Sequence, residues 1–335
     1  MKNFDPLQRI ERVNGNQSNL TTFLGYPVKD YDPGRSSQDG VVYRFKSDWD
    51  EHTLRPHLEH FLNSSAAEKA TALVIGAWQG DDSSATPDEV VQLLVDRASR
   101  LSNLEAIFLG DITMEENEMS WIYQTDVSPL LQAFGRLKFL RTRGGESLAI
   151  CKPVHSALRA LTMETGGMPA RVVHSLAEAD LPKLEYLELW LGTEEYGGNV
   201  SVEDLAPILK GNAFPGLRYL GLRNSDRADD IAKAILDSPI ASRVEVLDLS
   251  LGTLSDEGGK ALLQLRSFPL KKLCLYHHYM SDEIARQFAD FPYLHYSWGI
   301  SVCNWSWRSR KGISSTPKAY LCCSWYCHCS FGLRI

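Results

Sequence analysis

The stretch LEYLELWLGT, Leu184 to Thr193, returns sixty residues later as VEVLDLSLGT, Val244 to Thr253. The two copies share two core leucines and the closing Leu-Gly-Thr, and they differ at Trp190 and Ser250. Self-similarity of this kind is typical of a stacked array, in which each unit buries its apolar face against its neighbours. The stretch therefore predicts a repeat protein.

The underlying pattern is apolar-x-x-Leu-x-Leu, with some substitution at its core positions. It begins at Ala70, Leu104, Leu137, Leu158, Leu184, Leu217, Val244 and Leu270. A leucine-rich repeat of roughly 20 to 29 residues pairs one strand with one helix or turn, and the longer units here therefore carry insertions. The predicted fold class is α/β: a leucine-rich-repeat solenoid of about eight repeats. We expect a curved, right-handed βα superhelix with a parallel sheet on the concave face and helices on the convex face.

Alternation along each short strand explains the pattern. Leu187 and Leu189 point into the core, and Glu188 between them points outward. Parallel strands need crossover connections, and helix-start signals follow the strands where such connections are needed. These signals are Thr86-Pro-Asp-Glu, Ser201-Val-Glu-Asp, Ser255-Asp-Glu and Ser281-Asp-Glu.

The turn after each strand carries glycine where the commonest repeat consensus has asparagine. The position is occupied by Gly145, Gly166, Gly192, Ser225 and Gly252. We therefore expect these turns to use a positive φ, which glycine adopts without steric cost.

Composition is that of a folded, cytoplasmic protein. The chain of 335 residues is 44% hydrophobic and 23% charged, with a net charge of −7. It has no apolar signal core at its start and no run long enough to span a membrane. Residues 1 to 296 hold all 42 acidic residues and 30 of the 35 basic ones, a net charge of −12, which opposes binding to nucleic acid or to an anionic membrane.

Three segments follow from composition. Residues 1–66 form a leader and a capping strand and helix, with the strand at VVYRFK, Val41 to Lys46, and the helix from about Asp48 to Leu62. Residues 67–296 form the repeat array, whose exposed first unit such a cap would cover. His57 and His60 could share one face of the capping helix, but without a cysteine or a suitably spaced carboxylate motif they are interpreted as solvated.

Residues 297–335 form a basic tail rich in cysteine and tryptophan. Cys322, Cys323, Cys327, His328 and Cys329 suggest a zinc knuckle, but their spacing is too tight for paired structural ligands. The sequence therefore favours a disordered or out-of-frame segment without a structural role.

Several strings point to one family: LVIGAW from Leu73, IFLGDIT from Ile107, SWIYQTDVSPLL from Ser120, LGLRNS from Leu220 and YHHYMSDE from Tyr276. With the two opening copies, these blocks resemble a bacterial family of leucine-rich-repeat proteins with ribonuclease-inhibitor-like repeats. The similarity covers roughly residues 20 to 294. It implies the repeat fold and a cytoplasmic location, and it brings no catalytic activity, cofactor or active-site residue.

Function is then expected on the exposed faces of the array. Outward strand positions line the concave surface, where aromatic residues and arginine are typical of protein interfaces. We expect a partner protein or peptide to contact Phe108, Arg141, Arg143, Glu164, Glu188, Trp190, Arg223, Asp248 and Tyr276.

Insertions after three strands add an acidic rim along one edge of that surface. The rim residues are Asp81, Asp82, Glu115, Glu116, Glu118, Glu194 and Glu195. The charge favours a basic partner, so the chain is interpreted as a non-catalytic interaction scaffold. Neither a cofactor nor a bound metal is expected, and the oligomeric state is open.

An enzyme is the alternative function. His277 and His278, beside the concave carboxylates, could support acid–base or metal-assisted chemistry. The sequence lacks a phosphate loop, a nucleophile elbow and a zinc-protease helix, which favours the scaffold.

Overall fold

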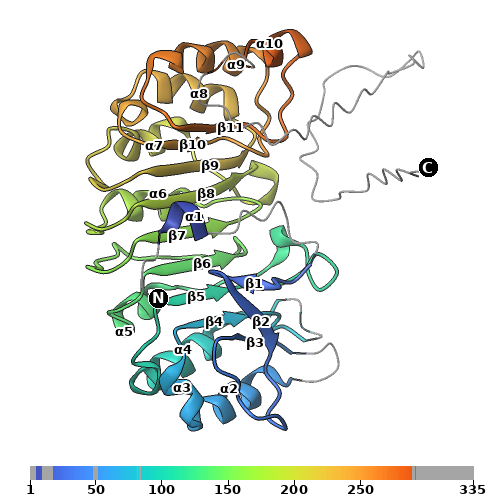
Figure 1. The fold of residues 1–335 in the computed structure, drawn as a ribbon. Helices are drawn as coiled ribbons and strands as arrows, with labels where there is room; N and C mark the ends of the chain where they lie inside the picture. Colours follow the sequence, from blue (N-terminus) through green and yellow to red (C-terminus); the bar gives the residue numbers. More distant parts are fainter. Residues whose placement is uncertain are drawn as a thin grey trace, which may run out of the picture.

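The computed structural model describes residues 5–9, 18–47, 52–80, 82, 84–288 and 291 (Figure 1). In this part of the chain the strands form one eleven-stranded sheet whose order follows the sequence. The β1 and β2 strands pair antiparallel, and every later neighbour from β2 to β11 pairs parallel. The predicted parallel sheet of a leucine-rich-repeat-like α/β fold is confirmed.

The strands are β1 (Thr22–Phe23), β2 (Tyr26–Asp30), β3 (Val42–Phe45), β4 (Ala72–Ile75), β5 (Ala106–Leu109), β6 (Phe139–Arg143), β7 (Ala160–Glu164), β8 (Tyr186–Gly192), β9 (Tyr219–Ser225), β10 (Val246–Asp248) and β11 (Lys272–Cys274). The α-helices are α1 (Pro6–Arg9), α2 (Leu54–Asn63), α3 (Ser65–Lys69), α4 (Asp88–Asp96), α5 (Ser128–Ala133), α6 (Ala170–Ala177), α7 (Val202–Leu209), α8 (Ala228–Leu236), α9 (Asp256–Leu263) and α10 (Asp282–Gln287). Short 3₁₀ turns are η1 (Ala98–Leu101), η2 (Met119–Trp121), η3 (Glu194–Tyr196), η4 (Pro239–Ser242) and η5 (Gln264–Ser267).

The sheet register follows the repeat alignment. Each predicted copy contains one strand, β4 to β11, and equivalent residues face each other across the ladder. Leu187, for example, pairs with Leu161 on one side and with Leu220 on the other. The Leu-x-Leu positions consequently stack into continuous apolar rows, which is how the units bury their faces against one another.

The main core lies between the sheet and the helices. The inward leucines of β4 to β11 belong to the same buried cluster as apolar residues of α2 to α10, such as Leu58, Leu94, Val173 and Ile231. The helices therefore cover the face of the sheet that carries the strand leucines.

A second apolar cluster lies on the opposite, concave face. It joins Leu20, Phe23 and Leu24 of the N-terminal segment to outward residues of the strands, including Phe108 and Phe139. The Phe23 ring lies 5.6 Å from Phe139 and 6.3 Å from Phe108 between centroids. Figure 1 shows the dark blue segments α1 and β1 lying across the later strands. The leader thus packs on the sheet.

Three predicted helix starts use the expected caps. Ser201 and Asp204 form a complete capping box, and Ser255 and Ser281 each accept a backbone hydrogen bond at the start of α9 and α10. At α4 the expectation was wrong, because Pro87 occupies the cap position and no side chain caps the helix. Thr86 instead donates its hydroxyl proton to Asp88.

The turn glycines depart from the prediction. Gly192 has the expected positive φ, at +68°, but Gly145, Gly166 and Gly252 do not adopt one. Their small size is used for close approach: a Cβ at Gly166 would lie 2.1 Å from Ser120 Oγ, and one at Gly252 would lie 2.8 Å from the Ser225 carbonyl oxygen. Tight stacking of successive loops, more than backbone conformation, requires glycine here.

The predicted capping strand and helix correspond to β3 and α2, both packed on the first array strand and its core. His60 Nδ1 lies 2.8 Å from the Tyr31 hydroxyl, and His57 packs its ring near the same tyrosine. The pair therefore supports the packing of this end. The whole segment 297–335, whose cysteines were considered as zinc ligands and which is expected to be disordered or out of frame, lies outside the described residues.

Candidate functional site

Register places the predicted concave residues in two contiguous rows. Arg141 lies between Phe108 and Thr162 in the ladder, and Glu188 lies between Thr162 and Gly221. In the second row Arg143 pairs with Glu164, and Trp190 pairs with Arg223. Strand alternation alone therefore located these residues on one face correctly.

The expectation that these concave residues are exposed to solvent is wrong. Eight of the nine predicted contact residues are 3% exposed or less, and only Tyr276, at 38%, reaches solvent substantially. The eight buried residues are Phe108, Arg141, Arg143, Glu164, Glu188, Trp190, Arg223 and Asp248.

One buried ion cluster joins β6 and β7. Arg141 donates to Glu164 Oε1 at 2.7 Å, and Arg143 donates to Glu164 Oε2 at 2.8 Å. Arg143 also donates to the Ile112 carbonyl, and the Arg141 guanidinium lies 4.3 Å from the centre of the Phe108 ring. Since burying a guanidinium without a partner is costly, one carboxylate holds both side chains against the sheet.

A second cluster centres on Glu188. Its carboxylate accepts hydrogen bonds from Arg223 at 2.8 Å, from Trp190 at 2.7 Å and from the Tyr186 hydroxyl. Burial opposes ionisation, but the Arg223 charge and these hydrogen bonds outweigh it and lower the pKa of Glu188 from 4.5 to about 2. Glu188 is therefore a structural anion at neutral pH.

Two tyrosines connect this cluster to the next strand. The Tyr186 and Tyr219 rings stack with centroids 3.9 Å apart, and the Tyr219 hydroxyl donates to Asp248 at 2.8 Å. Burial and the nearby Asp248 and Glu188 charges raise the pKa of Tyr219 well above its usual value. The hydroxyl is thus a hydrogen-bond donor and not a proton-transfer group at physiological pH.

The concave face closes because the leader supplies apolar side chains and the strands supply paired charges. Asp111, which follows β5, accepts hydrogen bonds from the Leu20 backbone N–H and from Arg44, and Arg44 also donates to the Leu20 carbonyl. Nearer the N-terminus, Asp5 precedes α1, and its Oδ1 lies 3.7 Å from Arg218 Nη1, just before β9. No periodic pattern predicts this arrangement, since the leader is outside the repeats.

The acidic rim differs from the concave rows. Asp82, Glu115, Glu194 and Glu195 are exposed, and Glu116 and Glu118 are half-buried; Asp81 lies outside the described residues. Glu116 pairs with Lys46 at 3.1 Å. Burial raises the pKa of Glu118, and no described residue hydrogen-bonds to its Oε1.

Two of the three rim insertions pack against the turn after β7. A Cβ at Gly166 would strike Ser120, and one at Gly167 would lie 2.1 Å from the Tyr196 carbonyl oxygen, so the turn after β7 lies between the two insertions. The loop after β5 contains Trp121, which is 60% exposed. Trp121 was not among the predicted site residues, although an aromatic residue inside an acidic insertion could have been recognised as a candidate contact.

The histidines of the enzyme alternative lie at the C-terminal end of the described sheet. Burial lowers the pKa of both His277 and His278, and His278 Nδ1 accepts a hydrogen bond from the Met280 backbone. The carboxylates expected to assist them, Glu164, Glu188 and Asp248, hydrogen-bond to arginine or tyrosine. Among the described residues no group of three or more His, Cys, Asp and Glu side chains is arranged to hold a metal ion.

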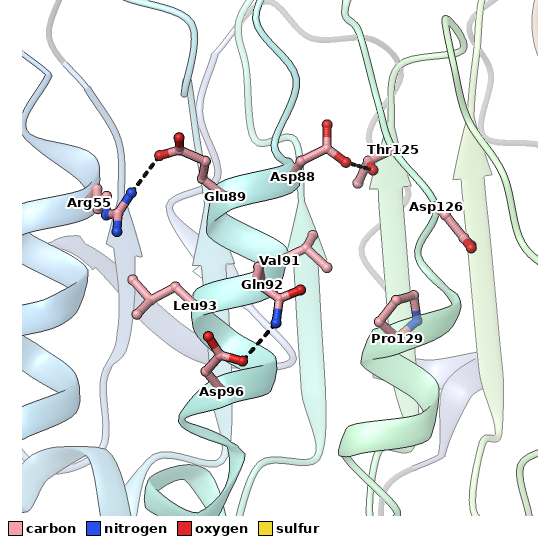
Figure 2. Close-up of a pocket in the computed structure, with 10 residues that line it drawn as sticks. All are labelled: Arg55, Asp88, Glu89, Val91, Gln92, Leu93, Asp96, Thr125, Asp126 and Pro129. Atoms are coloured by element: carbon pink, nitrogen blue, oxygen red, sulfur yellow. Dashed lines mark hydrogen bonds and ion pairs between the residues drawn. The ribbon is translucent and has the colours of Figure 1, made fainter.

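A shallow cleft of about 430 Å³ lies on the helical side, between α4 and the start of α5. Figure 2 shows that its polar side chains bind one another: Asp88 with Thr125, Glu89 with Arg55, and Gln92 with Asp96. Because these groups bind one another, the cleft provides no independent indication of a ligand.

These features define a leucine-rich-repeat-like α/β protein with a self-covered concave face and an acidic rim. Among solved structures it is similar to a structural-genomics protein from Bacteroides fragilis, with 29% identity and a TM-score of 0.69 over 74% of this chain and 71% of that one. It also matches an internalin from Listeria monocytogenes, with 14% identity and a TM-score of 0.37 over 76% of this chain and 59% of that one. No protein-family model and no curated protein matches the sequence.

Proposed function

We propose that this protein is an interaction scaffold that binds a basic partner protein or peptide at the acidic rim. The observation that carries the proposal is the exposure of Trp121 within the same loop as Glu115 and Glu118. Tryptophan is enriched among the residues that dominate binding energy at protein interfaces. A large exposed ring in a loop that also carries carboxylates is suited to the aliphatic stem and cationic head of lysine or arginine.

The concave residues have a different part in this proposal. Tyr276 is the one predicted contact with a substantially exposed side chain, and it offers a direct contact at the end of the array. The other eight support the strands from which the rim loops emerge. Rigid strands reduce the entropy that loops lose when they bind, so this support favours affinity at the rim.

The finer features of the array belong to the same proposal. We infer ribonuclease-inhibitor-like repeats, about eight in number, wound into a right-handed superhelix. The family resemblance and the alternation of strand and helix support this, as does the preference of such crossovers for the right hand. We also propose a cytoplasmic location. In the described residues no helix is long and apolar enough to cross a membrane.

The test is binding of fluorescent Lys- and Arg-rich peptides to the full chain at low and high salt. We expect binding that weakens with salt and falls at least about tenfold on the triple change Glu115→Lys, Glu194→Lys, Glu195→Lys. Trp121→Ala should weaken binding at both salt concentrations, because its contribution is largely apolar.

Asp237→Lys is the matched control, since this exposed carboxylate ends α8 on the helical side and the substitution changes charge equally per site. It should leave binding nearly unchanged. An equal loss of peptide affinity in Asp237→Lys and in the rim variants would contradict a site at the rim. Peptide affinity that is unchanged by Trp121→Ala would contradict it as well.

A further inference from the structure

A two-residue turn, Leu24-Gly25, joins β1 to β2, and Phe23 pairs with Tyr26 across it. Both turn residues have a positive φ, +54° at Leu24 and +81° at Gly25. A two-residue hairpin turn with this conformation usually contains asparagine or glycine at both positions. Leucine adopts a positive φ at a cost, because its Cβ crowds the backbone, so the turn is strained at Leu24. Pro27 restricts Tyr26 to an extended backbone, so the reversal must be made within the two turn residues.

Side-chain burial keeps this strained turn closed. The Leu24 side chain is 1% exposed and belongs to the concave apolar cluster, together with Leu20 and Phe23. The same cluster contains Phe108 and Phe139 of the array. Packing on the concave face therefore offsets an unfavourable backbone conformation, which persists because its surroundings impose it.

The residues before the turn bind to parts of the chain that lie well after it. Leu20 donates its backbone N–H to Asp111 at 3.1 Å, and its carbonyl accepts from Arg44 at 3.1 Å. Asn19 donates its side-chain amide to the Asp111 carbonyl at 2.7 Å. These contacts need the leader in place on the sheet, but they do not need the turn. An identical leader from a second copy of the chain fits the same surface.

We propose that residues 18–23 exchange between two copies of this chain, which then form a dimer. In the dimer Leu24 and Gly25 open into an extended hinge, and the leader of each copy packs on the concave face of the other. The contacts of the closed chain are kept, whereas the strain of the turn is relieved in both copies. Short strained hinge loops favour such an exchange of identical elements.

Two physical conditions govern the exchange. Association costs translational and rotational freedom, so the dimer fraction depends on protein concentration. The leader must also leave its own concave face before it can bind to another copy, and this local opening precedes the dimer. The exchange needs only this chain and is independent of any partner at the rim.

The experiment measures the molar mass of the full chain by size-exclusion chromatography with light scattering. Samples over a range of concentrations are first held in urea below the unfolding midpoint, which allows the leader to open, and are then returned to buffer. We expect monomer and a dimer whose fraction rises with concentration.

Hinge variants should shift this equilibrium in opposite directions. Gly25→Val should lower the dimer dissociation constant at least about tenfold, because valine disfavours a positive φ and favours an extended hinge. No atom lies within 4 Å of a Cβ at Gly25, so the substitution acts through backbone conformation alone. Leu24→Gly should raise the dissociation constant at least about tenfold, since glycine adopts the closed turn without strain.

Gly40→Val is the matched control. Gly40 has a φ of +75° and equally open space at its Cβ position, but it lies outside the hinge. This variant should have the dissociation constant of the parent. Equal effects of Gly40→Val and Gly25→Val would overturn the proposal, as would parent and Gly25→Val chains that stay monomeric at every concentration.

A cross-link distinguishes leader exchange from other modes of dimerisation. A tagged chain with Phe23 replaced by photoreactive p-benzoylphenylalanine is mixed with an untagged chain and taken through the same urea step. Illumination of the dimer should join the tagged leader to the untagged chain near Phe108 or Phe139, the rings that Phe23 contacts within one chain. A dimer in which position 23 links only to its own chain would overturn the proposal. Circular dichroism of each variant verifies that it is folded.

Discussion

Arg223 Nη1 lies 2.8 Å from Glu188 Oε1, and both side chains are almost completely buried on the concave face. Arg223 also stacks on the Trp190 ring, 4.9 Å from its centre, and lies 3.7 Å from Asp248. Surface ion pairs contribute little to stability, whereas removing one partner of a buried pair leaves an uncompensated charge. This relationship ties β8 to β9 and β10 on the face that the helices do not cover.

Replacing Arg223 by Leu should therefore destabilise the fold by about 3 to 5 kcal/mol. The double change Arg223→Leu with Glu188→Leu should recover part of this loss, because it removes the stranded carboxylate. Urea unfolding followed by circular dichroism measures both. A double variant less stable than Arg223→Leu alone would show that the hydrogen bonds of Glu188 with the tyrosine and tryptophan dominate instead.

Glu188 also predicts a pH dependence. Its pKa falls from 4.5 to about 2 on folding, so the stability that it contributes is fully present above pH 4.5 and is lost as the pH falls towards 2. The shift corresponds to a loss on the order of 3 kcal/mol. Urea unfolding between neutral and acid pH should give a shallower decline for Glu188→Gln than for the parent. Glu195→Gln should decline like the parent; identical curves for all three would contradict the assignment.

Gly192 should tolerate no side chain. A Cβ there would lie 1.8 Å from the Gly166 carbonyl oxygen, and its φ of +68° disfavours any L residue. Gly192→Ala should cost about 3 kcal/mol or more, since it combines backbone strain with a clash against another backbone. Gly197 is the matched control, with φ of +82° and open space around its Cβ position, so Gly197→Ala should cost only about 1 kcal/mol. Equal costs would show that the adjacent loop moves freely.

Phe23 should hold the leader on the concave face. Phe23→Ala removes a buried ring in contact with Phe108 and Phe139, and we expect a loss of about 3 to 5 kcal/mol. Amide hydrogen exchange in residues 18–24 should accelerate more than exchange in the helices. Thr22→Ala, at an exposed position of the same strand, should change stability by less than about 0.5 kcal/mol. Uniformly faster exchange would indicate that the leader and the array unfold as one unit.

Local patterns in the sequence were sufficient for the repeat scaffold. The Leu-x-Leu spacing predicted the strands β4 to β11 and the face on which Arg141, Glu188 and Arg223 lie, because strand alternation depends only on neighbouring residues. Ser201 and Ser281 likewise marked helix starts through hydrogen bonds that span three residues.

Exposure was decided only by tertiary structure. Whether Phe139 faces solvent depends on what packs above it, and Phe23 of the leader, which does so, lies more than one hundred residues away in the sequence. The ion pairs of Arg141 and Arg143 with Glu164 on the next strand compensate the charge of these two buried arginines. The sequence by itself determined which residues of each repeat lie on each face of the sheet, because that depends on local periodicity. Long-range packing decided that Trp121 and the rim are exposed and that the concave rows are buried.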